Sequence, residues 1–298
     1  MTLSPGTHSP LTVSSALGLR AYVVCATPRS GSTLLCELLK STGVAGRPEE
    51  FFEACLATGL PAHPGDYLDG LPPTGTGIRA DMTPPPAPEY SSLIGLENYR
   101  EHLERTFRLG TSRNGVFAAK LMWRHLPDLQ ALASQLPEYA GLELHDLLTK
   151  LLKDPRYVWV TRRDKVRQAV SLWRALQTRT WRVQHPREEQ STASLRYSFD
   201  GVEHLVRSLT AEDRAWSEHF EAHAIPVATV VYEDDLERDQ TAVVTAVLRH
   251  VGIGGPVGWR APVPMYRQAD ELNEEWVAAY HRDLAARDAR GEPRASGG

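Results

Sequence analysis

The stretch from residue 21 to residue 40 constrains the fold of this chain more than any other. Residues 21–26 form a short apolar run with β-branched members, which is typical of a buried parallel strand. Pro28 and Gly31 interrupt the chain, and apolar residues then repeat at helical spacing, namely Leu34, Leu35, Leu38 and Leu39. The stretch therefore predicts a strand, a tight turn and a helix in direct succession.

The turn between this strand and helix has the donors of an anion-binding loop. The first backbone N–H groups of a helix have no partner within it, and they favour negative charge. One guanidinium and three hydroxyl groups add donors, on Arg29, Ser30, Ser32 and Thr33. Hydrogen bonds to a charged partner contribute about 1.5–3 kcal/mol each, against roughly 0.3–1 kcal/mol from the helix dipole. We therefore expect residues 29–33, including the backbone of Gly31, to hold a phosphate or a sulfate.

The loop differs from the loop that binds nucleoside triphosphates. That loop follows the pattern G-x-x-x-x-G-K-[ST], in which the Lys contacts the β- and γ-phosphates and the hydroxyl binds Mg²⁺. Here Ser32 stands at the Lys position and Ala26 at the position of the first Gly. The loop instead resembles the 5′-phosphosulfate loop of sulfotransferases, which use 3′-phosphoadenylyl sulfate (PAPS) as the donor.

Further motifs along the chain narrow this resemblance. After residues 28–35 come, in order, the segments 42–46, 48–52, 120–123, 168–182 and 267–277. Together they resemble the Stf0 family of bacterial sulfotransferases, whose type member sulfates trehalose, from about residue 21 to residue 284. The resemblance implies a P-loop-like sulfotransferase fold, PAPS as the co-substrate, 3′-phosphoadenosine 5′-phosphate (PAP) as the product, and a homodimer.

The rest of the sequence predicts alternating strands and helices. Buried apolar runs predict three further strands, at residues 116–122, 156–161 and 227–232. Helical periodicity predicts six further helices, at residues 93–109, 142–153, 165–180, 201–224, 236–251 and 273–284. Strand, turn and helix therefore recur, which predicts an α/β fold with a central parallel sheet and flanking helices.

The chain is predicted to contain one domain. Residues 20–290 would form the sulfotransferase domain, interrupted by a Pro- and Gly-rich insertion at residues 54–90. We expect a disordered leader at residues 1–19 and a flexible tail at residues 291–298. The Pro-rich insertion is either a solvated loop or a wall of the acceptor pocket.

Composition agrees with a globular cytoplasmic enzyme. The 298 residues are 42% hydrophobic and 23% charged, and a net charge of −4 gives no indication of general nucleic-acid binding. There is no signal-peptide pattern and no apolar run near 18 residues, so we expect neither secretion nor membrane spanning. Three cysteines without a CxxC or Cys/His cluster predict free thiols and no metal site; they are Cys25, Cys36 and Cys55.

The second predicted strand–turn–helix unit carries a second candidate anion site. Arg162 follows the strand at residues 156–161, and Ser171 lies in the helix after it. In the Stf0 resemblance this pair would hold the 3′-phosphate of PAPS, and an arginine can hold two of its oxygens at once. The spacing is longer than the eukaryotic pattern R-x-x-x-D-x-x-x-S, so Arg163 is an alternative to Arg162. Arg267 is a third candidate for the same phosphate.

Glu50 and His125 are competing candidates for the general base. The resemblance places the catalytic carboxylate at Glu50, shortly after the first helix. His125 lies in residues 120–127, which resemble the Lys-x-His-Leu-Pro of cytosolic eukaryotic sulfotransferases with two extra residues. We expect Glu50 to accept the acceptor proton, while Arg29 stabilises the charge that develops on the leaving oxygen.

The expected reaction is sulfuryl transfer from PAPS to a hydroxyl of a carbohydrate or a secondary metabolite. Aromatic rings near a polar cleft would suit a carbohydrate, and the candidates are Trp123, Trp173 and Trp181. Residues 184–198 are polar and aperiodic, which predicts a mobile lid, with a passive connector as the alternative. The alternatives are a small-molecule kinase with a degenerate P-loop, using Asp234 or Asp235 for Mg²⁺, and a non-catalytic nucleotide-binding protein.

Overall fold

The fold was obtained as a computed structural model that describes most of the predicted domain. The described residues are 20–52, 67–69, 71, 98–178, 195–262 and 271–291. Outside them lie the predicted leader, all but four residues of the insertion at 54–90, and the predicted tail after residue 291. Residues 184–194 of the expected lid, Cys55, Trp181 and Arg267 also lie outside the described residues.

The centre of the fold is a four-stranded parallel sheet. Its strands are β1 (Arg20–Ala26), β2 (Val116–Met122), β3 (Arg156–Thr161) and β4 (Val227–Val231), in the order β2-β1-β3-β4. Every residue of β2 is buried, because helices cover both faces of the sheet and leave no strand face for polar side chains. The predicted α/β class with a central parallel sheet is confirmed.

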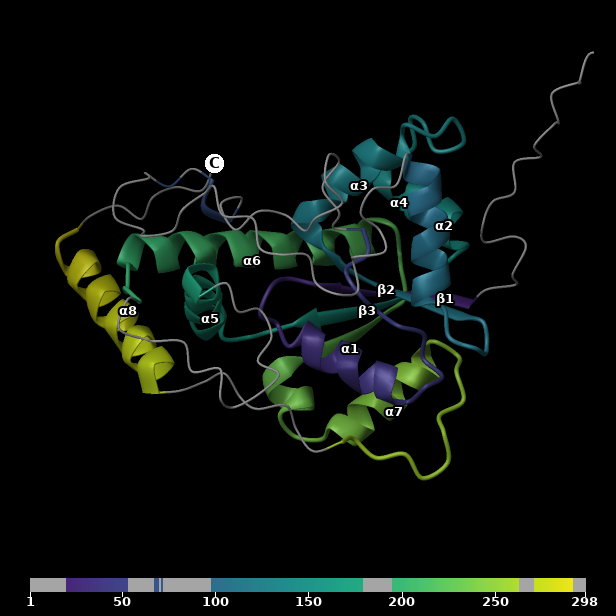
Figure 1. Cartoon of the computed structure of the whole chain (residues 1–298). Coiled ribbons are helices and arrows are strands. Elements are labelled where there is room, and N and C mark those ends of the chain that lie inside the picture. The colour runs from purple at the N-terminus through teal and green to yellow at the C-terminus, as the bar shows by residue number, and fades with distance from the viewer. Residues whose placement is uncertain are drawn as a thin grey trace, which may run out of the picture.

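Two sets of helices cover the two faces of the sheet (Figure 1). One face packs against α1 (Ser32–Ser41) and α7 (Gln240–His250). The other packs against α2 (Tyr99–Gly110), α3 (Leu126–Ala133), α4 (Leu144–Leu152) and the C-terminal part of α6 (Phe199–Ala222). Successive residues of β1 point to opposite faces, so Val23 and Cys25 join one core while Val24 and Ala26 join the other.

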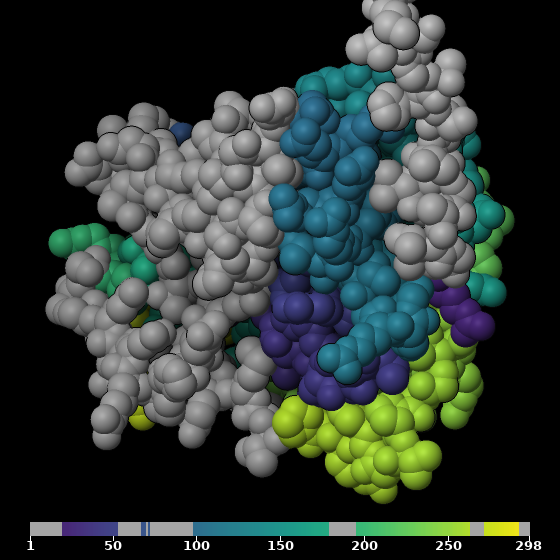
Figure 2. All heavy atoms as spheres, turned by 45° about the vertical axis from the view of Figure 1, so that its right-hand side comes forward, coloured from purple at the N-terminus to yellow at the C-terminus, as the bar shows by residue number. Residues whose placement is uncertain are grey.

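A third core lies beyond the carboxyl ends of the strands. It joins α5 (Lys165–Thr178) and α8 (Glu271–Ala289) to the N-terminal part of α6, around the buried Trp173. On another side of the molecule, α1 lies between α2 and α7, as the space-filling view shows (Figure 2). None of the described helices is both long and apolar enough to cross a membrane.

Two local details differ from the sequence prediction. The helix expected at residues 236–251 begins only at Gln240, because the chain first forms a π-helical turn, η5 (Tyr232–Leu236). Helix α3 follows a 3₁₀ turn, η3 (Trp123–His125), and was not predicted, since it is short and carries a proline in its first turn.

The strand order identifies where a ligand is expected. The chain leaves β1 toward β2 on one side, and later builds β3 and β4 on the other side. In open parallel sheets, ligands bind at the carboxyl ends of the strands where the order reverses. That point lies between β1 and β3, and the loops that follow these two strands carry Arg29 and Arg162.

Candidate anion-binding and catalytic site

The loop after β1 leaves the N-terminus of α1 open. Gly31 is the N-cap residue, with φ 92°, and none of the described side chains caps the helix. A Cβ atom at Gly31 would lie 2.5 Å from Cδ2 of Tyr232, so both the backbone angle and the available space require glycine. The first N–H groups of α1 can therefore be offered to an anion.

The hydroxyl groups of this loop have different neighbours. Ser30 is fully buried, and its Oγ has no hydrogen-bond partner among the described residues. Thr33 Oγ1 accepts a hydrogen bond from Lys120 Nζ at 3.2 Å. A buried hydroxyl without a partner destabilises a protein by about 1–3 kcal/mol, and a bound anion would give that of Ser30 an acceptor.

Arg29 joins the first loop to α5. Its Nε donates to Ser171 Oγ at 2.9 Å, and its backbone has a φ of 62°, which is uncommon for a residue with a Cβ atom. Burial and the guanidinium groups of Arg162 and Arg174 lower the pKa of Arg29 to about 10, while Tyr232 acts in the opposite direction. The Stf0 resemblance assigns Ser171 and Arg162 to one phosphate, and this hydrogen bond brings Arg29 of the first loop next to Ser171 as well.

Arg174 is a member of this cluster that the sequence reasoning missed. It lies one helical turn after Ser171 on α5, so both side chains are on the same side of the helix. Its Nη1 donates to Asn273 Oδ1 at 2.8 Å, at the start of α8. The available signal was the i, i+3 spacing from a serine already suspected of binding phosphate.

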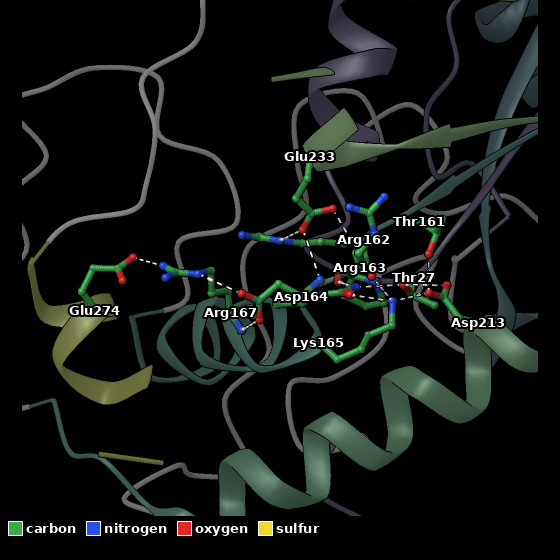
Figure 3. A network of polar contacts seen from close by, with 12 residues as sticks. Thr27, Thr161, Arg162, Arg163, Asp164, Lys165, Arg167, Asp213, Glu233 and Glu274 are labelled. Carbon is green, nitrogen blue, oxygen red and sulfur yellow. Dashed lines mark hydrogen bonds and ion pairs between the residues drawn. The ribbon is translucent and has the colours of Figure 1, made fainter. Parts of the chain in front are cut away.

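The two adjacent arginines after β3 have different environments (Figure 3). Arg162 Nε lies 3.4 Å from Glu233 Oε1, and its guanidinium lies 4.8 Å from the centre of the Tyr232 ring. Arg163 forms an ion pair with Asp234, and its side chain is 65% exposed. Arg162 therefore points inward and Arg163 outward, a distinction that the sequence left open.

A buried polar network fixes the ends of β1 and β3 (Figure 3). Asp213 of α6 accepts hydrogen bonds from Thr27 Oγ1 at 3.3 Å and from Thr161 Oγ1 at 2.6 Å. It also forms an ion pair with Lys165, at the start of α5. Gln168 Nε2 donates to Thr27 Oγ1 at 2.9 Å. These contacts hold the two candidate anion-binding loops in fixed positions relative to each other.

The two glutamates after α1 point to different lysines. The segment around Glu49 runs beside β2, where Lys120 N donates to Glu49 O at 2.9 Å. The Glu50 carboxylate forms an ion pair with Lys120, and the Glu49 carboxylate forms one with Lys40. Only Glu50 shares its lysine with a residue of the first loop, because Lys120 also contacts Thr33.

His125 has neighbours on the α6 side of the sheet. It is buried in η3, directly after β2. Burial raises the pKa of Glu212 on α6 above its ordinary value, and the charges of Arg124 and His125 act in the opposite direction. Arg124 Nε lies 3.4 Å from Glu212 Oε1. The two candidate bases therefore belong to different clusters.

Other candidate side chains also have described positions. Trp173 is fully buried, so it is a core residue and not a surface for a sugar, and Trp123 packs edge-on against Trp216. Within the described ranges, no group of three or more His, Cys, Asp or Glu side chains could hold a metal ion.

These features describe an α/β protein whose candidate anion-binding loops lie where the order of a parallel sheet reverses. The family model described as Stf0 sulphotransferase matches residues 21–283, and the chain belongs to this family. It is thus an enzyme of sulfuryl transfer.

Two curated relatives match almost the whole chain. Trehalose 2-sulfotransferase of Mycobacterium tuberculosis (strain ATCC 35801 / TMC 107 / Erdman) is 35% identical over 267 residues, which cover 89% of this chain and 96% of that protein. Trehalose 2-sulfotransferase of Mycolicibacterium smegmatis (strain ATCC 700084 / mc(2)155) is 34% identical over 270 residues, with 90% and 96% covered.

Proposed function

We propose that this enzyme transfers the sulfuryl group of PAPS to a hydroxyl group of a carbohydrate, with PAP as the second product. The family and the names of both relatives support a sugar acceptor, and trehalose is the first one to test. The observation that carries the proposal is the open N-terminus of α1 beside the cluster of Arg29, Arg162 and Ser171.

In this proposal the two loops hold different parts of the donor. The 5′-phosphosulfate would bind the first N–H groups of α1 and the hydroxyls of Ser30, Ser32 and Thr33. The 3′-phosphate would bind on the α5 side, at Arg162 and Ser171, with Arg174 beside them. Arg267 stays a candidate for the same phosphate, since it lies outside the described residues.

The reaction would need a base and a charge stabiliser. The Glu50 carboxylate would accept the proton of the sugar hydroxyl as its oxygen attacks sulfur in line with the leaving phosphate. Arg29 and the loop N–H groups would stabilise the negative charge that builds on the bridging oxygen. Because these donors are already fixed by the fold, little reorganisation would accompany the transfer.

The direct test combines turnover with two matched variants. Wild-type enzyme with PAPS and trehalose should release PAP without added metal. Glu50→Gln should lower kcat at least about a hundredfold, or about 2.7 kcal/mol in the barrier, and leave PAP affinity nearly unchanged. Glu49→Gln is the control, since Glu49 pairs with Lys40 instead. If His125→Gln lowers kcat more than Glu50→Gln, the base is the histidine.

The kinase alternative is tested by ligand-induced stabilisation. Both candidate Mg²⁺ ligands are engaged, since Asp234 pairs with Arg163 and Asp235 Oδ2 accepts from Val231 N at 2.7 Å. PAP at about a hundred times its Kd should stabilise the fold by roughly 2.7 kcal/mol. Stabilisation by ATP with Mg²⁺ but not by PAP would reject the proposal. The expected cytoplasmic homodimer is tested separately, by sedimentation and cell fractionation.

A further inference from the structure

Lys120 is a buried charge in the middle of an apolar strand. It is 1% exposed, and it lies in β2 between residues that all belong to the core. Removing an ammonium from water destabilises a fold by several kcal/mol unless the ammonium is paired and hydrogen-bonded. Its position in β2 therefore needs a reason beyond packing.

The contacts of Lys120 join the candidate base to the donor loop. Its Nζ forms an ion pair with Glu50 and donates to Thr33 Oγ1 at 3.2 Å. The ammonium also lies near Cys36 of α1. Burial raises the pKa of the Cys36 thiol to about 12, and the charge of Lys120 acts in the opposite direction. Lys120 thus lies beneath the first turns of α1, next to the open helix N-terminus.

The position of Lys120 also accounts for a residue that the loop lacks. A triphosphate loop has a lysine directly before its Ser or Thr, and this chain has Ser32 there, directly before Thr33. Lys120 brings an ammonium to the hydroxyl of Thr33 from a neighbouring strand. Unlike the lysine of a triphosphate loop, which contacts phosphates, Lys120 forms an ion pair with the Glu50 carboxylate.

We propose that Lys120 is a positioning residue of the transfer reaction, which acts by holding the Glu50 carboxylate ionised and fixed beside the donor loop. This inference rests on the proposed role of Glu50 as the base. In the step it supports, the acceptor O–H bond breaks and its proton passes to Glu50. The acceptor oxygen forms a bond to sulfur, and the bond from sulfur to the bridging oxygen breaks to release PAP.

The chain offers a matched control for this lysine. Lys40 forms the same kind of ion pair with the neighbouring Glu49, and it also pairs with Glu37 at 2.6 Å. It lies in the last turn of α1, about 12 Å along the helix from Ser32. Replacing either lysine with methionine removes one ammonium from its glutamate partners, and of these Glu–Lys pairs only that of Lys120 includes the candidate base.

The experiment compares Lys120→Met with Lys40→Met in three assays. For Lys120→Met we expect kcat to fall about 30- to 100-fold while PAP affinity stays within about threefold. The acid-side limit of the pH–rate profile should move to higher pH, since the carboxylate has lost the cation that keeps it ionised. Adding Lys120→Met to Glu50→Gln should change kcat less than about threefold, because both act through one carboxylate.

Opposite outcomes would overturn the inference. It fails if Lys120→Met matches Lys40→Met in kcat, or if it weakens PAP binding as much as it lowers kcat. If Lys120→Met does not fold, Lys120→Gln gives the same test, since its amide can still donate to Glu50 and Thr33 without a charge. An unchanged pH–rate profile in a folded variant would reduce the role of Lys120 to packing.

A readout without turnover separates this inference from the proposed function. The difference in unfolding free energy between wild type and Lys120→Met should shrink as the pH falls below the ordinary glutamate pKa of about 4.3, because Glu50 of the wild type then takes up a proton and the pair loses its charge. In the Glu50→Gln background this pH dependence should disappear. If the wild type never releases PAP from PAPS, the proposed function fails. If the difference in unfolding free energy between wild type and Lys120→Met does not depend on pH, the inference that Lys120 keeps Glu50 ionised fails.

Discussion

The two strand–turn–helix units of the central sheet carry similar residues, but the backbone N–H groups at their helix N-termini have different hydrogen-bond partners. After β1, Gly31 is the N-cap residue of α1, and no side chain in the described part of the protein caps this helix. After β3, the N–H groups of Arg163 and Asp164 donate to the carboxylate of Glu233, at 3.0 and 3.2 Å. Asp164 in turn accepts from Arg167 N at 2.8 Å. The first N–H groups of α1 are therefore available to an anion, whereas in the second unit the N–H groups of Arg163, Asp164 and Arg167 already donate to carboxylates.

This difference suggests a division of labour between the units. A group whose charge changes during a reaction benefits from fixed N–H donors, which are available only in the first unit. Burial acts to raise the pKa of Glu233, but hydrogen bonds from backbone N–H groups and the charge of Arg162 outweigh this effect. The pKa of Glu233 is therefore lowered, which favours the ionised carboxylate. If the second unit binds the 3′-phosphate as proposed, we therefore expect it to do so mainly through side chains, above all Arg162.

The largest expected effect that tests this comparison is that of Arg29→Ala on turnover. We expect kcat to fall about 10²–10³-fold, as when a donor to a developing negative charge is removed, with a smaller loss of PAP affinity. Arg163→Ala is the control, since that side chain is largely exposed and should change kcat less than twofold. Steady-state kinetics and PAP titration measure both. If PAP affinity falls as much as kcat, the result contradicts the proposal that the two units bind different anionic groups of the donor.

A smaller effect is expected from closing the space at Gly31. Gly31→Ala adds a methyl group 2.5 Å from the Tyr232 ring at a left-handed backbone angle, which should destabilise the fold by about 1–3 kcal/mol. Gly43→Ala is the control, because Gly43 has φ 70° but nothing within 4 Å of the added atom. Urea unfolding should show the larger loss at Gly31. Since Tyr232 also lies beneath Arg162, only Gly31→Ala should weaken PAP binding.

The smallest expected effect concerns pH and lies outside both units. Burial, and then the charges of His223 and His145, lower the pKa of His219 to about 4. Between the ordinary value near 6.5 and pH 4, the unfolded chain binds a proton here that the folded chain does not, so the free energy of unfolding falls as the pH is lowered. His219→Phe should flatten this slope between pH 7 and 5 without changing kcat. The same slope in the variant would contradict the assignment.

The sequence predicted the sheet well because buried parallel strands are short apolar runs bounded by turns. The predicted strand at residues 116–122 has the bounds of β2, and the other three differ by no more than one residue. Local pattern was weaker where a proline or a π turn interrupts the chain, as at α3 and η5.

The contacts within the candidate site were harder to foresee. The Stf0 resemblance assigned Ser171 and Arg162 to the same phosphate, but it gave no sign of the hydrogen bond that Arg29, 142 residues away, donates to Ser171. The pairing of Lys120 with Glu50 depends in the same way on how the segment after α1 returns beside β2. Such long-range contacts follow from packing between elements, and residue spacing does not encode them.

The division of labour between the two units is tested most directly by titrating wild type and Arg162→Ala with PAP and with adenosine 5′-phosphate, which lacks the 3′-phosphate. The account predicts that Arg162→Ala weakens PAP binding about tenfold or more, because it removes a charged hydrogen-bond donor worth about 1.5–3 kcal/mol. Binding of adenosine 5′-phosphate should stay within about twofold of wild type. Equal losses for the two nucleotides would show that Arg162 does not serve the 3′-phosphate, and would contradict the account.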